Sequence, residues 1–282
     1  MRVLLVPNTG NPRSVQAVRE LAVWLVSGGW ESVLVSEDAE AVGLPEHGVP
    51  RTGIGVPALA VALGGDGTIL KAVHLSESAD TPVLGVNLGR LGFMSGADAA
   101  SMREAITDAL AGDVRVERRA TLQAEVSMAG RTMGRFRALN EVFVGRGPTG
   151  RVVDVAVSVN GSPLVRFLAD GVVVATPTGS TAYALSAGGP VLAPDVGGTV
   201  VVPVAAHTLR SRPLVIGPSD RVEIAFPNPL RANACVSVDG EAMPCRQALE
   251  RVAVWRGERD VALVKHDGRG FYDVLRDEFL GG

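Results

Sequence analysis

The stretch ALAVALGGDGTILKAV, residues 58–73, decides the fold, because it joins an apolar strand to a helix through a loop that holds three glycines. The short apolar run 58–63 is typical of a strand buried on both faces of a parallel sheet. The glycines of 64–67 let the backbone approach a ligand, and the amides that open the next helix, residues 68–75, face whatever lies in front. This order of strand, glycine loop and helix predicts a phosphate-binding corner.

One carboxylate, Asp66, lies among these glycines, where its charge would repel a phosphate. Asp66 could hold Mg²⁺, could accept a proton from an attacking hydroxyl, or could simply cap the helix, and the sequence leaves these readings open. Lys71 lies early in the same helix and could offset the repulsion, although a lysine on an amphipathic helix is often only solvated. In NLGRLGF, residues 87–93, Arg90 lies between glycines, which fits either a second phosphate-facing loop or an ordinary turn.

Residues 1–112 alternate apolar runs of strand length with stretches of helical periodicity, which predicts a Rossmann-like α/β domain with a parallel sheet. Asn11 and Pro12 predict a helix start, and Gly28 predicts its end. Residues 37–57 contain several proline, glycine and acidic residues without any period, so we expect a loop there.

Residues 113–266 contain successive β-rich runs, and the pairs Asn160-Gly161 and Asp239-Gly240 lie where two-residue hairpin turns need positive φ. We therefore expect a second, β-rich and sandwich-like domain. A chain of 282 residues is long enough for two domains of about 150 residues each. Helical spacing returns in the last segment, 267–282, which we expect to pack back on the first domain.

A second informative stretch, residues 170–190, leads from an apolar strand into a crowd of hydroxyl side chains at a helix entrance. One hydroxyl would suffice to cap that helix. The surplus favours a polar surface that recognises a base and a ribose. The side chains concerned are Thr176, Thr178, Ser180, Thr181 and Tyr183.

Composition excludes several classes of protein. The chain is 46% hydrophobic and 20% charged, so it should fold as a globule, and a net charge of −3 argues against a nucleic-acid partner. Apolar runs such as residues 198–206 are far shorter than the ~20 residues of a membrane span. The only cysteines, Cys235 and Cys245, have no paired spacing, and no signal segment opens the chain, so we expect a cytoplasmic protein with reduced thiols.

Other familiar motifs fail their context. GRGPTG, residues 145–150, matches GxGxxG, but a strand follows it instead of a helix, so we expect a hairpin loop there. No Walker-type GxxxxGK[ST] loop and no GxSxG elbow occurs. The four histidines do not lie near one another at ligand spacing, so zinc chemistry is not predicted. These histidines are His47, His74, His207 and His266.

With these motifs in hand, the chain resembles the NAD kinase family over nearly its whole length. GGDG alone is also found in diacylglycerol kinases and phosphofructokinases, whereas GGDGT followed by Asn-Glu and TPTGSTAY is specific. The matching landmarks are LGGDGTIL (63–70), NLGRLGF (87–93), NEV (140–142), ADGVVVATPTGSTAYALSAGGP (169–190), HTLRSRPLVI (207–216) and VDGE (238–241).

The resemblance implies an NAD kinase-like fold and transfer of the terminal phosphoryl group of ATP, or of polyphosphate, to the 2′-hydroxyl of the adenosine ribose of NAD, which makes NADP. It implies a donor and catalytic-loop domain over 1–112, a dinucleotide-binding domain over 113–266, and NAD in the cleft between them. It further implies Mg²⁺ or another divalent cation held mainly by ATP, with no protein side chain assigned to the metal. Self-association as a homodimer or homotetramer is also implied.

The resemblance assigns residues to both substrates. Asp66 contacts the ribose hydroxyls and accepts the proton. Further contacts to NAD are implied for Gly67, Asn140, Glu141, Arg151, Asp170, Thr178, Thr181, Ala182, Tyr183, Ala184, Leu185 and Ser186. Contacts to the phosphate donor are implied for Gly64, Gly65, Gly67, Thr68, Lys71 and Arg90. The chain departs from many relatives at Leu168 and Ala169, where those have a basic residue and a glycine, so the choice between NAD and NADH stays open.

Two alternatives remain beside this reading. A lipid or sugar kinase could share GGDG, but it would not need the adenosine-recognising strip. A dinucleotide sensor could bind NADP without transferring anything, although Asp66 and Lys71 argue against that.

Overall fold

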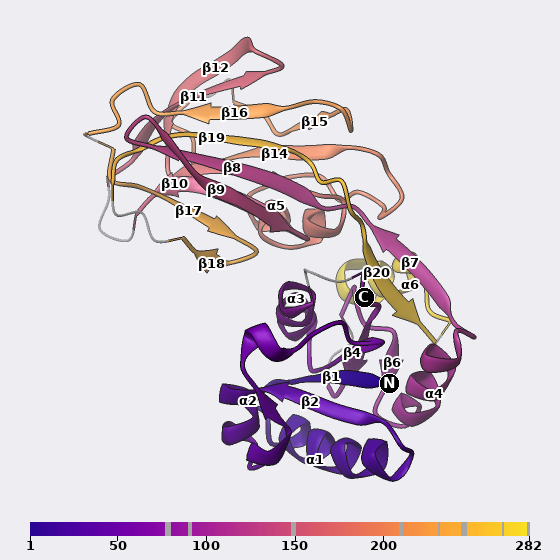
Figure 1. The fold of residues 1–282 in the computed structure, drawn as a ribbon. Helices are drawn as coiled ribbons and strands as arrows, with labels where there is room; N and C mark the ends of the chain where they lie inside the picture. The colour runs from indigo at the N-terminus through magenta and orange to yellow at the C-terminus, as the bar shows by residue number, and fades with distance from the viewer. Residues whose placement is uncertain are drawn as a thin grey trace. The chain divides into compact units, whose positions relative to one another are not determined.

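The computed structural model describes residues 1–76, 80–89, 92–147, 151–208, 211–230, 232–243, 247–266 and 268–280. The chain forms two compact units, which we name unit 1 (Met1–Arg118 with Val261–Gly282) and unit 2 (Arg119–Asp260) (Figure 1). The domain boundaries predicted from the sequence, after residues 112 and 266, lie six residues from each of these. The difference arises because β7 (Arg115–Arg119) and β20 (Val261–Lys265) belong to the sheet of unit 1.

Unit 1 is built on one sheet with the order β3-β2-β1-β4-β5-β20-β7, and β6 pairs with β5. Strand β1 runs parallel to both β2 and β4, and β4 runs parallel to β5, so the expected α/β unit with a parallel sheet is confirmed. Its other strands are β1 (Arg2–Pro7), β2 (Glu31–Val35), β3 (Gly48–Val49), β4 (Leu59–Leu63), β5 (Val83–Asn87) and β6 (Ala97–Asp98).

Apolar side chains at helical spacing attach the helices to this sheet. Helix α1 (Pro12–Ser27) buries Val18, Leu21 and Leu25 in one core with β1 and β4. Its predicted ends are confirmed, since the side chain of Asn11 accepts a hydrogen bond from the amide of Arg13, and Gly28 is the C-cap residue. The other helices of unit 1 are α2 (Ser36–Ala41), α3 (Asp66–Leu75), α4 (Met102–Ala111) and α6 (Phe271–Leu275).

The prediction of a loop over 37–57 is wrong. This segment contains most of α2, the 3₁₀ turns η1 (Pro45–His47) and η2 (Arg51–Gly53), and the short strand β3. Ala39 and Val42 pack into the core of unit 1 although their neighbours are polar. Elements this short do not produce a readable period, and only tertiary packing defines them.

The C-terminal segment 271–280 is helical, as its spacing predicts, but it continues from α6 into a π-helical turn, η4 (Arg276–Leu280). Its aromatic side chains pack on the loop after β5. The ring of Phe93 lies 5.6 Å from that of Phe271 and 5.9 Å from that of Phe279. This segment therefore belongs to unit 1.

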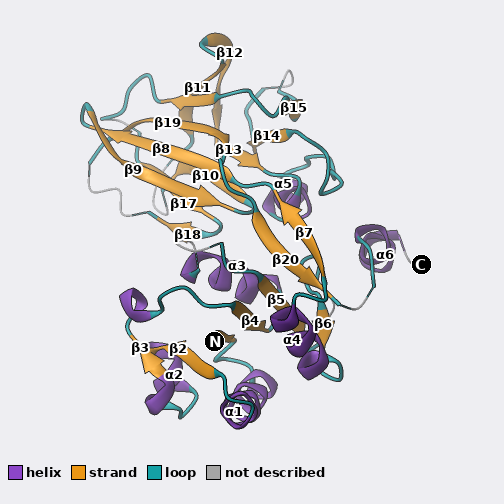
Figure 2. Ribbon diagram, turned by 45° about the vertical axis from the view of Figure 1, so that its right-hand side comes forward, coloured by secondary structure: helices purple, strands orange, loops and turns teal. Residues whose placement is uncertain are grey.

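Unit 2 consists of two six-stranded sheets, and Figure 2 shows that almost all its regular structure is strand. Valines of β10 and β13 on one sheet and of β8 and β19 on the other share one apolar core, which makes a sandwich and confirms the β-rich expectation. One sheet holds β15 (Leu214–Ile216), β14 (Thr199–Val204), β13 (Gly171–Ala175), β10 (Glu141–Arg146), β17 (Ala234–Val238) and β18 (Glu241–Ala242). The other holds β12 (Ser162–Ala169), β11 (Val153–Val159), β16 (Val222–Ala225), β19 (Leu249–Arg256), β8 (Leu122–Met128) and β9 (Arg131–Ala138).

Both predicted hairpins of unit 2 are confirmed. Asn160 and Gly161, with φ of 51° and 78°, connect β11 to β12. Asp239 and Gly240, with φ of 48° and 83°, connect β17 to β18. The GRGPTG segment lies between β10 and β11, but its residues 148–150 are outside the described part of the chain. In the described ranges, no helix has the length and apolar character needed to cross a membrane.

Candidate functional site

The glycine loop lies at a point where the topology of unit 1 changes direction. From β1 the chain passes to β2 on one side, and it later returns to β4 on the other side of β1. Ligands of open parallel sheets bind at such a point, beyond the carboxyl ends of the strands. A cavity of about 360 Å³ lies there, lined by Pro7, Asn8, Thr9, Gly65, Gly67, Thr68 and Lys71.

The three glycines of the loop differ in the space around them. A Cβ at Gly64 would lie 2.5 Å from Oγ1 of Thr68 and 3.2 Å from Cβ of Asn8, so the neighbouring side chains leave no room for a larger residue there. A Cβ at Gly65 or Gly67 would have no atom within 4 Å, and both residues line the cavity, so the backbone of these two glycines is open to it. Helix α3 starts at Asp66, and the amides of its first turn are those that a helix leaves for a ligand.

The carboxylate of Asp66 is fixed by the loop that follows β5. The backbone amides of Phe93 and Met94 donate to Oδ2 and Oδ1 at 3.1 Å and 3.2 Å. A Cβ at Gly92 would lie 2.2 Å from Oδ1 of Asp66, so only glycine leaves room for this arrangement. The N-cap residue of α3 is Gly65, which has no side chain, and the structure shows no side-chain cap on this helix. Asp66 is therefore a positioned carboxylate.

Lys71 forms an ion pair with a buried carboxylate. Its Nζ donates to Oδ1 and Oδ2 of Asp38 at 2.6 Å and 2.8 Å, and it also lines the cavity beside the glycine loop. The reading of Lys71 as an ordinary solvated lysine does not describe this geometry. Arg90, the other cation expected to contact the phosphate donor, lies outside the described residues.

In unit 2, a sharp corner presents Asn140 and Glu141 at the start of β10. The carboxylate of Asp239 accepts three backbone hydrogen bonds there, from the amides of Leu139 (2.7 Å), Asn140 (2.7 Å) and Glu141 (3.0 Å). The hydroxyl of Thr176 donates to the carbonyl of Leu139 at 2.6 Å. These bonds fix the corner before any ligand arrives.

Three buried polar atoms at this corner have no hydrogen-bond partner: Oδ1 of Asn140, Oε2 of Glu141 and Oγ1 of Thr178. Their residues are only 7%, 8% and 6% exposed. The 3₁₀ turn η3 (Thr178–Thr181) packs directly on Asn140, since a Cβ at Gly179 would lie 2.1 Å from its carbonyl oxygen. A buried polar atom without a partner costs about 1–3 kcal/mol, so three together point to a polar ligand.

Glu141 is also electrostatically unusual. Burial, and secondarily the negative charge of Asp239, raises the pKa of Glu141 from 4.5 to about 7. Both causes disfavour the charged form of the carboxyl group. A group whose pKa is higher in the folded than in the unfolded state stabilises the fold at low pH, and this stability is lost as the pH rises from about 4.5 through about 7.

We expect Glu141→Gln, which is neutral at every pH, to be about as stable as the unmodified protein at pH 4.5. At pH 8.5 it should be more stable, by up to about 3 kcal/mol. Thermal melts of both proteins at the two pH values measure this. The exposed Glu241 of the same unit offers a matched control, Glu241→Gln, which makes the same substitution at an exposed carboxylate. An equal difference at both pH values for Glu141→Gln would contradict the raised pKa.

Most hydroxyl side chains in the segment after β13 bond to the backbone of unit 2, although the sequence predicts that they recognise a ligand. Ser180 donates to the carbonyl of Pro177 and accepts from the amide of Leu192, and Thr181 donates to the carbonyl of Thr178 at 3.2 Å. Because Thr176 also bonds to the carbonyl of Leu139, three of the four serine and threonine hydroxyls predicted to recognise the ligand instead donate to backbone carbonyls. The fourth, the buried hydroxyl of Thr178, has no partner.

The remaining predicted contacts to NAD vary in exposure. Tyr183 is 41% exposed and packs edge-on against Phe143, with ring centroids 5.7 Å apart. Asp170 forms an ion pair with Arg146 at 2.8 Å. In α5 (Tyr183–Ser186) and beside it, Ala184 is buried, Ala182 and Leu185 are half-buried, and Ser186 is exposed, as is Arg151 after β10.

The residues that hold these groups in place are not predicted from the sequence. Asp38 lies in the segment predicted as a loop, and Gly92 is only one letter of the landmark NLGRLGF. Asp239 is predicted only as a turn residue of a hairpin. A glycine beside a candidate carboxylate and an acidic residue in a hairpin turn were the available signals. Their partners follow only from the tertiary contacts.

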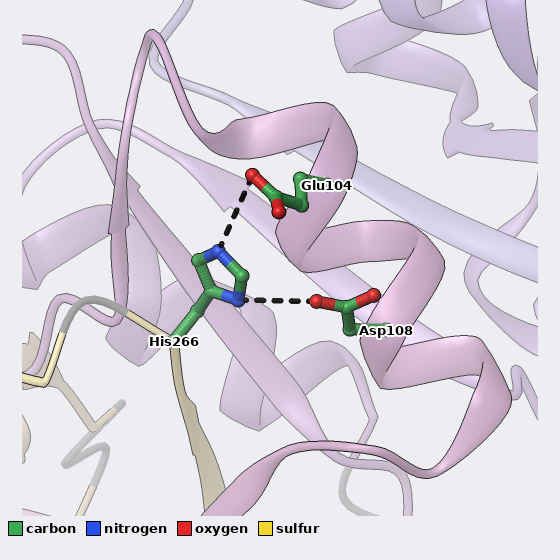
Figure 3. A group of neighbouring side chains, drawn as sticks. All are labelled: Glu104, Asp108 and His266. Carbon is green, nitrogen blue, oxygen red and sulfur yellow. Dashed lines mark ion pairs between the residues drawn. The ribbon is translucent and has the colours of Figure 1, made fainter.

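A separate group of candidate ligand atoms lies elsewhere in unit 1 (Figure 3). Glu104 and Asp108, one turn apart on α4, face His266 at the end of β20, and the three ligand atoms lie within 4.8 Å of one another. Nε2 of His266 is 3.9 Å from Glu104, and Nδ1 is 3.5 Å from Asp108. When His266 is protonated, these contacts are ion pairs that join β20 to α4.

Comparisons with known proteins agree with both units. The ATP-NAD kinase N-terminal domain matches residues 3–114, and the ATP-NAD kinase C-terminal domain matches residues 139–266. An NAD kinase of Desulforamulus reducens is 36% identical over 97% of this chain and 95% of its own length. An NAD kinase of Corynebacterium diphtheriae is 39% identical over 97% of this chain and 89% of its own length.

Two solved structures are similar to the whole chain. Yeast NADH kinase complexed with NADH superposes with a TM-score of 0.88 and 26% identity, covering 100% of this chain and 87% of its own. An NAD kinase from Archaeoglobus fulgidus in complex with ATP has a TM-score of 0.73 and 25% identity, covering 99% of this chain and 97% of its own.

Proposed function

This chain belongs to the NAD kinase family and is an enzyme that phosphorylates NAD to NADP, and we propose that Asp66 aligns the attacking 2′-hydroxyl and accepts its proton. The observation that carries this role is the fixed Asp66 carboxylate beside the open backbone of the glycine loop. ATP is the phosphoryl donor that the Archaeoglobus fulgidus complex supports. Polyphosphate as an alternative donor follows from the family resemblance alone.

The reaction forms a bond between the ribose 2′-oxygen and the terminal phosphorus of ATP and breaks the bond from that phosphorus to the bridging oxygen. ADP leaves, and the proton of the hydroxyl passes to Asp66. A ribose hydroxyl is a far weaker acid than a carboxylic acid, so this transfer comes late, once the phosphoryl group has begun to move. Asp66 therefore contributes mainly by alignment.

The donor phosphates are proposed to bind at the cavity of unit 1. The open backbone of Gly65 and Gly67, the start of α3 and the ammonium group of Lys71 all offer donors to phosphate oxygens there. Gly64 shapes the loop, and Thr68 lines the cavity. Arg90 is proposed as a further donor contact from its place in NLGRLGF.

A divalent cation, Mg²⁺ in the first instance, is proposed to be held by the ATP phosphates, where it would neutralise charge that develops during transfer. Among the described residues, the three side chains that could together hold a metal are Glu104, Asp108 and His266, and Asp66 is not one of them.

The adenosine of NAD is proposed to bind unit 2 at the corner of Asn140, Glu141 and Thr178, whose unpartnered oxygens would accept or exchange hydrogen bonds with it. Asp170 is proposed to lie on the nicotinamide side. Tyr183, with Arg151 and the residues around α5, is proposed to complete the contacts. Unit 1 would thus be the donor and catalytic unit, and unit 2 the dinucleotide-binding unit.

Two further properties are proposed from the resemblance and composition. Self-association as a homodimer or homotetramer is checked by light scattering on a sizing column. A cytoplasmic location follows from the two cysteines without paired spacing.

The decisive test of function is incubation of the purified protein with ATP, Mg²⁺ and NAD, followed by a dehydrogenase that accepts only NADP. We expect NADP to accumulate in proportion to the protein added. A lipid or sugar kinase would instead phosphorylate diacylglycerol or a sugar phosphate and leave NAD unchanged. A sensor would bind NAD or NADP with no turnover.

A further inference from the structure

Asp38 has a buried carboxylate, and both of its oxygens are bonded to one lysine that lines the donor cavity. It is 5% exposed, and both of its oxygens accept from Nζ of Lys71, at 2.6 Å and 2.8 Å. Helix α2 delivers it from the carboxyl end of β2, the strand next to β1. Asp38 does not line the cavity itself, and its link to the cavity is Lys71.

Lys71 connects this carboxylate to the cavity. Its side chain is 36% exposed, and it lines the cavity together with Gly65, Gly67 and Thr68. A lysine ammonium group has three N–H donors and no acceptor. Two of them are directed to Asp38, which leaves the third for a ligand in the cavity.

The contact between Asp38 and Lys71 restricts the position of the lysine ammonium group and balances the buried charge of Asp38. Lysine carries its charge on a flexible four-carbon stem, so an unrestrained Lys71 would visit many rotamers and hold a phosphate loosely. A bidentate contact to a buried carboxylate restricts the ammonium group to one place. Removal of Lys71 would leave the buried charge of Asp38 uncompensated, and removal of Asp38 would leave the ammonium group of Lys71 unrestrained.

We propose that Asp38 is a positioning residue for the phosphate donor, which holds Lys71 so that its third N–H faces the phosphate chain. This inference rests on the proposed function of the cavity. Asp38 itself does not touch the donor, and it acts only through Lys71. Its removal should therefore weaken binding of the phosphate chain and leave NAD binding unchanged.

The test is the steady-state kinetics of Asp38→Asn with each substrate varied in turn. We expect KM for ATP to rise about tenfold, as for the loss of one charge-assisted hydrogen bond, with KM for NAD changed less than about twofold. Lys71→Met should show the same pattern. Glu31→Gln, which breaks the exposed Arg2–Glu31 pair of the same unit (2.7 Å), is the matched control and should leave both KM values unchanged.

The double variant Asp38→Asn/Lys71→Met removes both charges. It allows the proposal to be tested even if the single variant Asp38→Asn does not fold. Its KM for ATP should equal that of Lys71→Met alone, because Asp38 acts only through Lys71. A further rise above Lys71→Met, or an unchanged KM for ATP in a folded Asp38→Asn, would overturn the proposal. An unmodified protein that makes no NADP would instead overturn the proposed function.

Calorimetric titration with tripolyphosphate separates a contact to the phosphate chain from one to the rest of ATP. Tripolyphosphate carries only the chemistry that ATP and polyphosphate share. Its Kd should rise by the same factor as KM for ATP in Asp38→Asn. Weaker ATP binding with unchanged tripolyphosphate binding would place Lys71 on another part of ATP and refute the role assigned to Asp38.

Discussion

Asp66→Asn is expected to lower kcat about 10³-fold, within the range typical of a lost general base, and to change the Kd for NAD less than about threefold. The amide cannot accept the proton of the 2′-hydroxyl. Because the NAD contacts proposed in unit 2 are untouched, binding should persist. Coupled NADP assays give kcat, and calorimetric titration with NAD gives Kd.

A stability control belongs with this variant. Both oxygens of Asp66 accept backbone hydrogen bonds, and the side chain of asparagine has only one such oxygen. The unfolding free energy should therefore fall by about 1 kcal/mol, too little to explain a 10³-fold loss at the assay temperature. A folded Asp66→Asn protein with unchanged turnover would remove the proton-acceptor role.

Gly92→Ala is expected to lower kcat about 10²-fold with little loss of stability, through displacement of Asp66. The new Cβ would lie 2.2 Å from Oδ1 of Asp66, so the carboxylate must move. The atom displaced is the end of a flexible side chain, so the fold can accommodate the change. A misplacement of about 1 Å in a catalytic group can cost about 10²-fold in rate.

The same loop provides the matched control. A Cβ at Gly89 meets no atom within 4 Å, so Gly89→Ala changes the loop without touching Asp66. Its kcat should equal that of the unmodified protein. Equal kcat values for Gly92→Ala and Gly89→Ala would show that the position of the carboxylate does not limit turnover.

The strand, glycine loop and helix around Asp66 could be predicted because all the information is local. An apolar run, three glycines and a helical period lie within residues 58–73. The turns at Asn160-Gly161 and Asp239-Gly240 were equally readable, because their positive φ values suit those residue types. Local backbone preference decides such elements before packing contributes.

What the sequence could not reveal depends on contacts between distant segments. The polar composition of 37–57 concealed α2 and hence Asp38, whose partner Lys71 comes from another helix. The hydroxyls after β13 looked equivalent in sequence, but backbone acceptors engage three of them and leave Thr178. Burial sets the pKa of Glu141, and burial is a property of the fold.

The most direct test of the central claim is a crystal structure of this protein with NAD and a non-hydrolysable ATP analogue. We predict that the 2′-oxygen of the adenosine ribose lies within hydrogen-bonding reach of the Asp66 carboxylate, about 2.6–3.2 Å, with the terminal phosphate next to that oxygen. A 2′-oxygen beyond the reach of Asp66, even through one water molecule, would contradict the account.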